Sequence, residues 1–98
     1  MGKYTGPTRS QLERWGRIRE LGCAVKDDWH FGEIEIHHCK TGAGGRKNHD
    51  KVISLCTGHH RGTRGIHTLS RKVWQSKYDT EDSFLELTKH DLGEENEI

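Results

Sequence analysis

The chain has 98 residues, of which 30% are apolar and 32% are charged. This length suits one domain with a marginally stabilising core, and small cores of this kind often need a metal or disulfides. The three cysteines are an odd number and lie among histidines, which favours metal-bound thiolates in a reducing compartment over a secreted disulfide scaffold. Because the sequence shows no secretory signal and no long apolar run, we expect a cytoplasmic protein without membrane contact.

Charge is segregated along the chain, so the formal net charge of +1 hides two oppositely charged parts. Residues 1–78 carry 15 lysines and arginines against seven acidic residues, whereas residues 79–98 carry one against eight. A basic part of this kind suits a polyanion such as nucleic acid. The acidic part indicates a solvated tail, and shielding of the basic surface is the less favoured alternative.

The N-terminal part predicts a flexible arm followed by a helix. Residues 1–7 contain two glycines and a proline without any pattern, and Thr8 or Ser10 then suits the N-cap of a helix that Gly22 would end. One apolar face of this helix would be formed by residues spaced three apart: Leu12, Trp15, Ile18 and Leu21.

Two short strands joined by a long loop are expected next. Residues 33–37 alternate polar with β-branched apolar residues, and residues 52–56 form a second short apolar run. The connection, residues 40–50, holds three glycines and several basic residues. Long loops between short strands are more often functional than idle.

Helical patterns fill most of the remaining chain. One turn is expected after Cys56, until Gly62 and Gly65 interrupt it. A helix over residues 70–78 would turn Val73 and Trp74 inward. Another over residues 80–89 would be capped by Thr80 and contains the apolar residues Phe84, Leu85 and Leu87.

These elements predict a small α+β fold. We expect one domain over residues 8–91, with an acidic tail over residues 92–98 that is disordered from Gly93 onward.

Seven of the eight histidines and all three cysteines lie between Cys23 and His67. Imidazole and thiolate are common ligands of zinc-like metals, and imidazole transfers protons near neutral pH. Adjacent strand residues point to opposite faces, so His37 and His38 cannot both bind one ion without distortion. We therefore expect one of them to bind a metal and the other to face a substrate.

A second metal site is suggested by the spacing Cys56-x-x-His59, which is that of one zinc knuckle. It needs two partners, and Cys23 and His30 are the best candidates. Cys39 is less favoured because an apolar residue would serve equally well after the strand. If there is no such zinc, Cys23 and Cys56 are small core residues.

The order strand, His-His, loop, strand, Leu-Cys-x-x-His-His and helix resembles the HNH (ββα-metal) endonucleases from about residue 21 to 78. Within that superfamily the chain is similar to the phage-borne Ref family of RecA-dependent recombination-enhancement nucleases. The matching residues are Leu21-Gly22-Cys23, Glu35-Ile36-His37-His38, Gly42-x-Gly44, Arg46, His49-Asp50, Leu55-Cys56-x-x-His59-His60-Arg61, Gly65-Ile66-His67, Trp74 and Tyr78 to Glu81.

Two positions depart from the family pattern. Lys26 stands where the family usually has a second cysteine, and this bears on whether a structural zinc exists. The HNH asparagine would fall near Asn48, whereas the Ref-like match falls on His49. Which of the two supports the general base stays open at this point.

The resemblance implies an HNH core and hydrolysis of DNA phosphodiester bonds with a divalent metal, Mg²⁺ or Mn²⁺, or Zn²⁺ as purified. It implies His37 as metal ligand and His38 as general base, with His49 positioning His38 or the phosphate. His60 would be the second metal ligand and His67 the third. The Ref likeness further implies RecA-coated DNA as the target, in the bacterial host of a phage or prophage.

Phosphate contacts are expected from the basic residues around the histidines. Residues 39–78 contain nine basic residues and one acidic one, and nothing there resembles a groove-reading helix, so sequence specificity should be weak. The expected DNA-binding residues are Lys40, Arg46, Lys47, Arg61 and Arg64.

Two other functions compete with this one. A non-catalytic zinc module that binds DNA or protein would have no use for His38, which points away from the metal. A homing or packaging HNH nuclease would need a long DNA-reading extension that these 98 residues lack.

Overall fold

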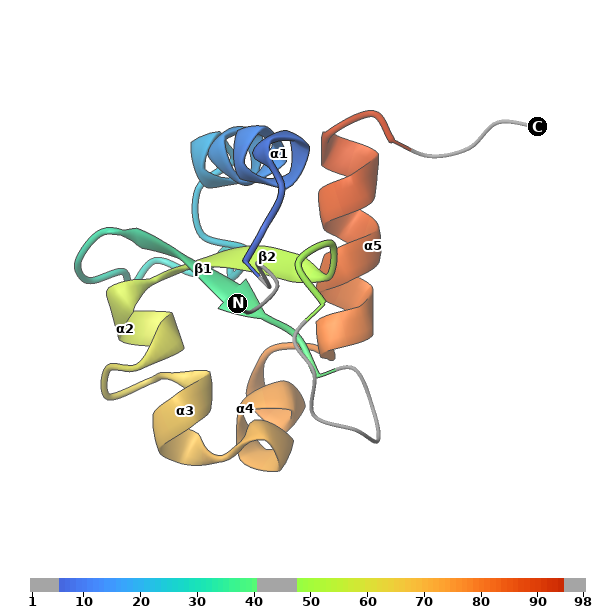
Figure 1. Ribbon diagram of the computed structural model, residues 1–98. Coiled ribbons are helices and arrows are strands. Elements are labelled where there is room, and N and C mark those ends of the chain that lie inside the picture. Colours follow the sequence, from blue (N-terminus) through green and yellow to red (C-terminus); the bar gives the residue numbers. More distant parts are fainter. Residues whose placement is uncertain (1–5, 41–47, 95–98) are drawn as a thin grey trace, which may run out of the picture.

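The structure, a computed structural model, describes residues 6–40 and 48–94, which form an α+β fold built on a two-stranded antiparallel hairpin (Figure 1). The elements are α1 (Arg9–Glu20), β1 (Ile34–His38), β2 (Val52–Cys56), α2 (Thr57–His60), α3 (Ile66–Leu69), α4 (Arg71–Lys77) and α5 (Glu81–Asp91). Figure 1 shows α1 on one side of the hairpin and α2, α3 and α4 on the other, while α5 runs beside β2. Within the described ranges, none of the helices has the length and apolar character needed to cross a membrane.

Helix α1 begins and ends as its sequence predicts. Thr8 is the N-cap and forms a capping box with Gln11, and Gly22 has the positive φ of 85° that commonly ends a helix. The predicted apolar face is wrong at Leu12, which is 49% exposed, while Trp15 and Ile18 are buried. Residues three apart are offset by about 60° around a helix, so a strict three-residue spacing drifts off one face.

The hairpin places the two neighbouring histidines of β1 opposite β2. His37 pairs with Ile53 and His38 with Val52, and β1 lies one residue later than predicted. All five residues of β2 are buried, because helices cover both of its faces. Val52 packs with Trp15 of α1, whereas Ile53 belongs to the larger core on the other side.

The C-terminal helices lie close to their predicted ranges, and Thr80 caps α5 as expected. Trp74 is fully buried, but the inward orientation predicted for Val73 is wrong, because it is 47% exposed. Adjacent helix positions differ by about 100°, so Val73 and Trp74 cannot both face one core. On α5, Leu87 is exposed and Phe84 is buried. The short helix α3 was not anticipated.

The two expected mobile ends lie partly outside the described residues, as do residues 41–47 with the predicted DNA contacts Arg46 and Lys47. Glu94 is an exception to the disorder predicted from Gly93 onward. Its carboxylate accepts hydrogen bonds from the Arg14 side chain at 2.8 to 3.1 Å, which tie this end of the chain to α1.

Gly58 supports a tight contact that a larger residue would disrupt. A Cβ atom there would lie 2.4 Å from the Trp29 ring. We expect Gly58→Ala to lower the free energy of unfolding by about 1–3 kcal/mol, as other overpacked sites do. Gly16→Ala is the matched control, since nothing lies within 4 Å of its Cβ position and it should raise the stability by about 0.5–1 kcal/mol. Urea denaturation of both variants checks this, and equal effects would contradict the packing argument.

Candidate metal centres and histidine pair

Three histidines from three elements meet on the α2–α4 side of the hairpin. His37 of β1, His60 of α2 and His67 of α3 each offer one ring nitrogen, and these atoms lie within 4.8 Å of one another. Their ring centroids are 4.8 to 5.2 Å apart. The structure thus brings together the three residues expected to hold the catalytic ion, in an arrangement that could hold a metal.

The chain turn between α2 and α3 brings His67 back to His60. Gly65 is essential to this turn, because a Cβ atom there would lie 2.6 Å from the His60 carbonyl oxygen. Its amide donates to the carbonyl of Gly62, which closes the turn. The sequence showed these two glycines as interruptions of a helix, and their role here is close backbone approach.

A carboxylate fixes the orientation of His60. Glu35 Oε1 lies 2.8 Å from His60 Nδ1, which leaves Nε2 as the ring nitrogen that can coordinate. Glu35 also accepts hydrogen bonds from Arg61 and Thr57. The Arg61 guanidinium, with help from His60 and Thr57, lowers the Glu35 pKa to about 2 despite partial burial. Metal-bound histidines typically use their second nitrogen in this way.

The electrostatic surroundings of His60 and His67 favour the neutral imidazole, which is the form that binds metals. Burial lowers the pKa of His60, and the neighbouring His37 lowers it further, although Glu35 acts in the opposite direction. Burial likewise lowers the pKa of His67, together with His37, His60 and Arg71. Lone pairs are therefore available at neutral pH.

His38 lies in different surroundings from His37, on the α1 side of the hairpin. Its Nε2 is 3.0 Å from His49 Nδ1, and its ring meets the Trp15 ring edge-on with centroids 5.3 Å apart. Trp15 Nε1 donates to the His49 carbonyl oxygen at 2.9 Å, which fixes the main chain there. Asn48, the alternative support for His38, accepts a hydrogen bond from the Asp50 amide instead. The geometry therefore favours His49 as the partner of His38.

A second group contains the four residues expected to hold a structural zinc. The donor atoms of Cys23, His30, Cys56 and His59 all lie within 4.8 Å of one another. His59 Nδ1 is 3.2 Å from the Cys56 sulfur and 3.6 Å from the Cys23 sulfur. Two sulfurs and two imidazoles form a ligand set that is compatible with zinc.

The two thiols of this group have opposite acidities. Burial alone would raise the Cys56 pKa, but hydrogen bonds from the Phe31 and His59 amides and from the His30 and His59 rings lower it to about 6. Burial raises the Cys23 pKa to about 11, and the neighbouring Cys56 adds to the rise. Cys56 is therefore the more acidic of the two thiols, and a metal cation would further favour its thiolate form.

Surrounding residues enclose and orient the Cys/His group. Asp27 Oδ2 lies 3.2 Å from His59 Nε2, so Nδ1 is the nitrogen directed at the two sulfurs. The Trp29 ring meets the His59 ring edge-on, and the Arg64 guanidinium lies 4.5 Å from the centre of the Trp29 ring. Lys26, at the position where the resemblance led us to look for a second cysteine, donates to the Leu21 carbonyl oxygen. His30 is the residue that completes the set.

A third group of possible ligands shares His37 with the first. His37, Cys39 and Glu81 are all buried and offer atoms within 4.8 Å of one another. Burial raises the Cys39 pKa to about 12, and the nearby Glu81 carboxylate contributes. A thiol this weakly acidic is a poor metal ligand, which agrees with the low rank given to Cys39 from the sequence.

Two of the predicted phosphate-binding arginines are already engaged within the fold. Arg61 forms a two-point interaction with Glu35, and Arg64 lies over Trp29. Lys40 is exposed and lines a pocket of about 440 Å³ together with Arg71 and Glu81.

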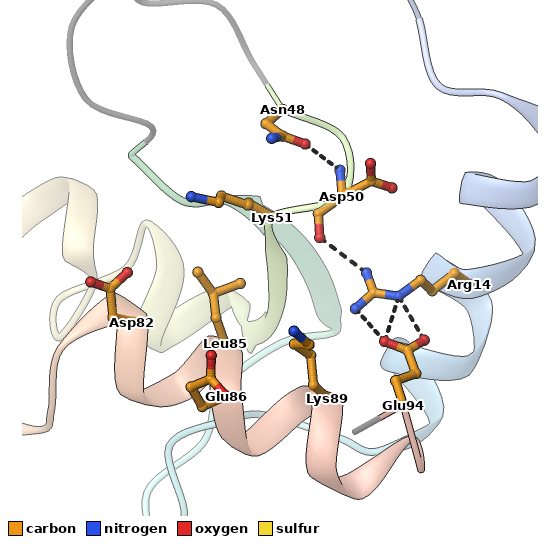
Figure 2. Close-up of a pocket in the computed structure, with 9 residues that line it drawn as sticks. All are labelled: Arg14, Asn48, Asp50, Lys51, Asp82, Leu85, Glu86, Lys89 and Glu94. Carbon is orange, nitrogen blue, oxygen red and sulfur yellow. Dashed lines mark hydrogen bonds and ion pairs between the residues drawn. The ribbon is translucent and has the colours of Figure 1, made fainter. Parts of the chain in front are cut away.

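A larger pocket of about 600 Å³ lies between α5, α1 and the segment before β2 (Figure 2). Figure 2 shows Arg14 bound to Glu94 and to the Asp50 carbonyl at one end, with side chains of both charges around the cavity. The lining contains no histidine or cysteine among the described residues: Arg14, Asn48, Asp50, Lys51, Asp82, Leu85, Glu86, Lys89 and Glu94. Within the described part of the chain, this larger pocket therefore shares no residue with the groups that could hold a metal.

Reasoning from the sequence missed three carboxylates that hold histidines. Asp27, Glu35 and Glu81 bond to His59, His60 and His37 respectively. Only Glu35 had a local signal, because residues two apart on a strand share a face and Glu35 therefore lies beside His37. The other two come from separate elements.

Protein-family models, curated proteins and solved structures were compared with this chain, and none of them matches it.

Cobalt substitution tests the Cys/His group. Cobalt-loaded protein should show the sulfur-to-metal absorption of thiolate ligands. Cys56→Ser should weaken this absorption, because the Cys23 thiolate remains, and Cys23→Ser combined with Cys56→Ser should remove it. Zinc affinity should fall by more than the roughly 10- to 100-fold that loss of an outer partner costs. Cys39→Ser is the matched control, since Cys39 is buried but lies outside this group. Absorption that survives the combined change of Cys23 and Cys56 and disappears in Cys39→Ser would contradict the assignment.

Proposed function

We propose that the protein is a metal-dependent HNH endonuclease that hydrolyses DNA phosphodiester bonds. The observation that carries this proposal is that the two neighbouring histidines of β1 belong to different groups of side chains. His37 faces two further histidines on one side of the hairpin, and His38 is bonded to His49 on the other. A metal group and a separate proton-accepting pair in adjacent strand positions are what metal-assisted hydrolysis requires.

The three-histidine group fits a divalent metal by its donor chemistry. Three imidazoles converge, and the outer nitrogen of His60 is bonded to a carboxylate, as is usual for a metal-bound histidine. His37, His60 and His67 would hold the ion, which we propose is Mg²⁺ or Mn²⁺ in action or Zn²⁺ as purified. Of these ions Zn²⁺ suits three imidazole donors best, and Mg²⁺, which prefers oxygen, suits them least. When bound, the ion would supply positive charge to the scissile phosphate and the departing oxygen.

His38 acts as the general base in this proposal. Its Nε2 lies 3.0 Å from His49 Nδ1. This role requires the proton of that contact to sit on His38 Nε2, so that Nδ1 would be the atom that accepts a proton from the attacking water. His49 then stabilises the imidazolium that forms, as an orienting partner does in other histidine-based sites. The edge-on Trp15 ring restricts the orientation of both histidines.

DNA would bind mainly through its phosphates. Lys40 and Arg71 are the described cations beside the 440 Å³ pocket, and Arg46 and Lys47 belong to the segment outside the described residues. Contacts of this kind give weak sequence preference and strong salt dependence. The Ref likeness extends the proposal to RecA-coated DNA in the cytoplasm of a phage-infected or lysogenic bacterium, with weak cleavage when no partner is present.

The Cys/His group supports a second, compatible proposal, a structural zinc that joins the residues after α1 to α2. It also supports the alternative function, a non-catalytic zinc module that binds DNA or protein. The two functions differ in their need for His38, because a structural zinc at Cys23, His30, Cys56 and His59 makes no use of it.

A plasmid-cleavage assay separates these functions. Wild type and His38→Ala are compared with Mg²⁺, Mn²⁺ or EDTA, with and without RecA–ATP filaments. We expect His38→Ala to reduce the cleavage rate about 100- to 10,000-fold, the usual worth of a general base, while fold and metal content persist. His90→Ala, a change at an exposed residue of α5, should leave cleavage intact.

The outcomes are distinct. Cleavage that needs metal and His38 but not RecA would keep the nuclease and remove the partner. Absence of cleavage under every condition, with zinc still bound, would favour the binding module. Loss of folding or metal in His38→Ala would point to a structural role for His38.

A further inference from the structure

We propose that Glu81 of α5 is a positioning residue of the three-histidine group, which holds His37 in the tautomer that directs Nδ1 at the metal. Glu81 is the last of the residues that match the Ref family, but the sequence predicts no role for it, and it comes from an acidic part of the chain expected to be mainly solvated. The inference rests on the proposed metal site, but its test measures ring protonation and metal binding, which do not require cleavage.

The contact between Glu81 and His37 is short and buried. Glu81 Oε2 lies 2.7 Å from His37 Nε2, and the two side chains are 8% and 1% exposed. A buried charge without a partner is costly, so a contact of this kind requires complementary groups. His37 Nε2 is the donor if the carboxylate is ionised, and Nδ1 is then the remaining ring nitrogen.

The carboxylate is held in place independently of His37. Glu81 Oε1 accepts hydrogen bonds from Arg71 Nε at 3.0 Å and from the Lys40 amide at 3.3 Å. The Glu81 amide donates to Gln75 Oε1 at 3.1 Å, which fixes the start of α5. Two donors, one of which is the Arg71 cation, keep the carboxylate ionised and in one orientation, so it can impose a tautomer on His37.

The arrangement repeats what Glu35 does for His60, with the ring nitrogens exchanged. Glu35 is hydrogen-bonded to Nδ1 of His60, so Nε2 is the nitrogen that could coordinate a metal. Glu81 is hydrogen-bonded to Nε2 of His37, so Nδ1 is the corresponding nitrogen there. Carboxylate partners of this kind set the tautomer and raise the basicity of metal-bound histidines. Two ligands of one group therefore each have a carboxylate behind them, from β1 and from α5.

The competing role for Glu81 is that of a direct ligand in the group with His37 and Cys39. Both of its oxygens already accept hydrogen bonds, and the Arg71 cation lies against one of them. A metal ion there would have to displace these contacts and sit beside that cation. The geometry therefore favours positioning over ligation, and the two roles predict different ring protonation.

Nitrogen NMR of the imidazoles tests the proposal on the intact, metal-free protein. Long-range ¹⁵N–¹H spectra should show His37 protonated on Nε2 and unprotonated on Nδ1. In Glu81→Gln the side-chain amide can donate to Nε2, so we expect the tautomer to reverse and Nδ1 to carry the proton. Protonation of His37 on Nδ1 in the wild type would overturn the proposal, whatever the variants do.

Metal binding gives the second readout. Protein preloaded with one equivalent of zinc at the Cys/His group is titrated with Mn²⁺, followed by the EPR signal of the free ion. Glu81→Gln should weaken Mn²⁺ binding about 10- to 100-fold, and Glu81→Asp, which keeps the charge, should weaken it less. Glu86→Gln removes an exposed carboxylate from the same helix and should leave binding unchanged.

Equal Mn²⁺ affinity in wild type and Glu81→Gln would overturn the positioning role. Loss of the wild-type Nε2 proton on adding a second equivalent of Zn²⁺, a diamagnetic ion that leaves the ring signals observable, would identify Glu81 and His37 as joint ligands and overturn it as well. If tautomer and affinity respond as expected while the wild type cuts no DNA, the positioning role stands and the nuclease proposal fails. If the wild type cuts DNA but neither the tautomer of His37 nor the Mn²⁺ affinity responds to Glu81→Gln, the nuclease proposal stands and the positioning role fails.

Discussion

Successive side chains of a β-strand point to opposite faces, and in β1 this rule divides the histidine cluster into two parts. His37 faces α2 and α3, where two more histidines meet it, and His38 faces α1 and is bonded to His49. A one-residue shift in the pairing of β1 with β2 would exchange these environments. The buried residues of β2 prevent that shift, because Val52 and Ile53 pack into different cores.

Hydrogen bonds between carboxylates and histidines connect several elements of this small fold. Each of three buried or half-buried histidines has a carboxylate on its outer nitrogen, from the segment after α1, from β1 and from α5. These pairs connect elements that contribute little apolar surface. Two metal ions at the Cys/His and three-histidine groups would add further cross-links to a core that is small for 98 residues.

Local sequence signals predicted much of the fold, and together with the resemblance they named residues that the structure brings into groups able to hold a metal. Capping residues located α1 and α5, alternation located the hairpin, and short spacings such as Cys56-x-x-His59 indicated ligands that the structure brings together. Sequence could not reveal partners from distant elements, so Asp27 and Glu81 were missed. The exposure of Leu12 and Val73 was missed for a related reason, since helix faces depend on what packs against them.

We propose that His37, His60 and His67 hold one divalent ion beside, but apart from, the His38–His49 pair. Crystals of the Mn²⁺-loaded protein, measured at an X-ray energy where manganese scatters anomalously, would locate this ion. We expect an anomalous peak among the three imidazoles, with His37 coordinating through Nδ1. A peak only between Cys39 and Glu81, or no peak at the three histidines at saturating Mn²⁺, would contradict it.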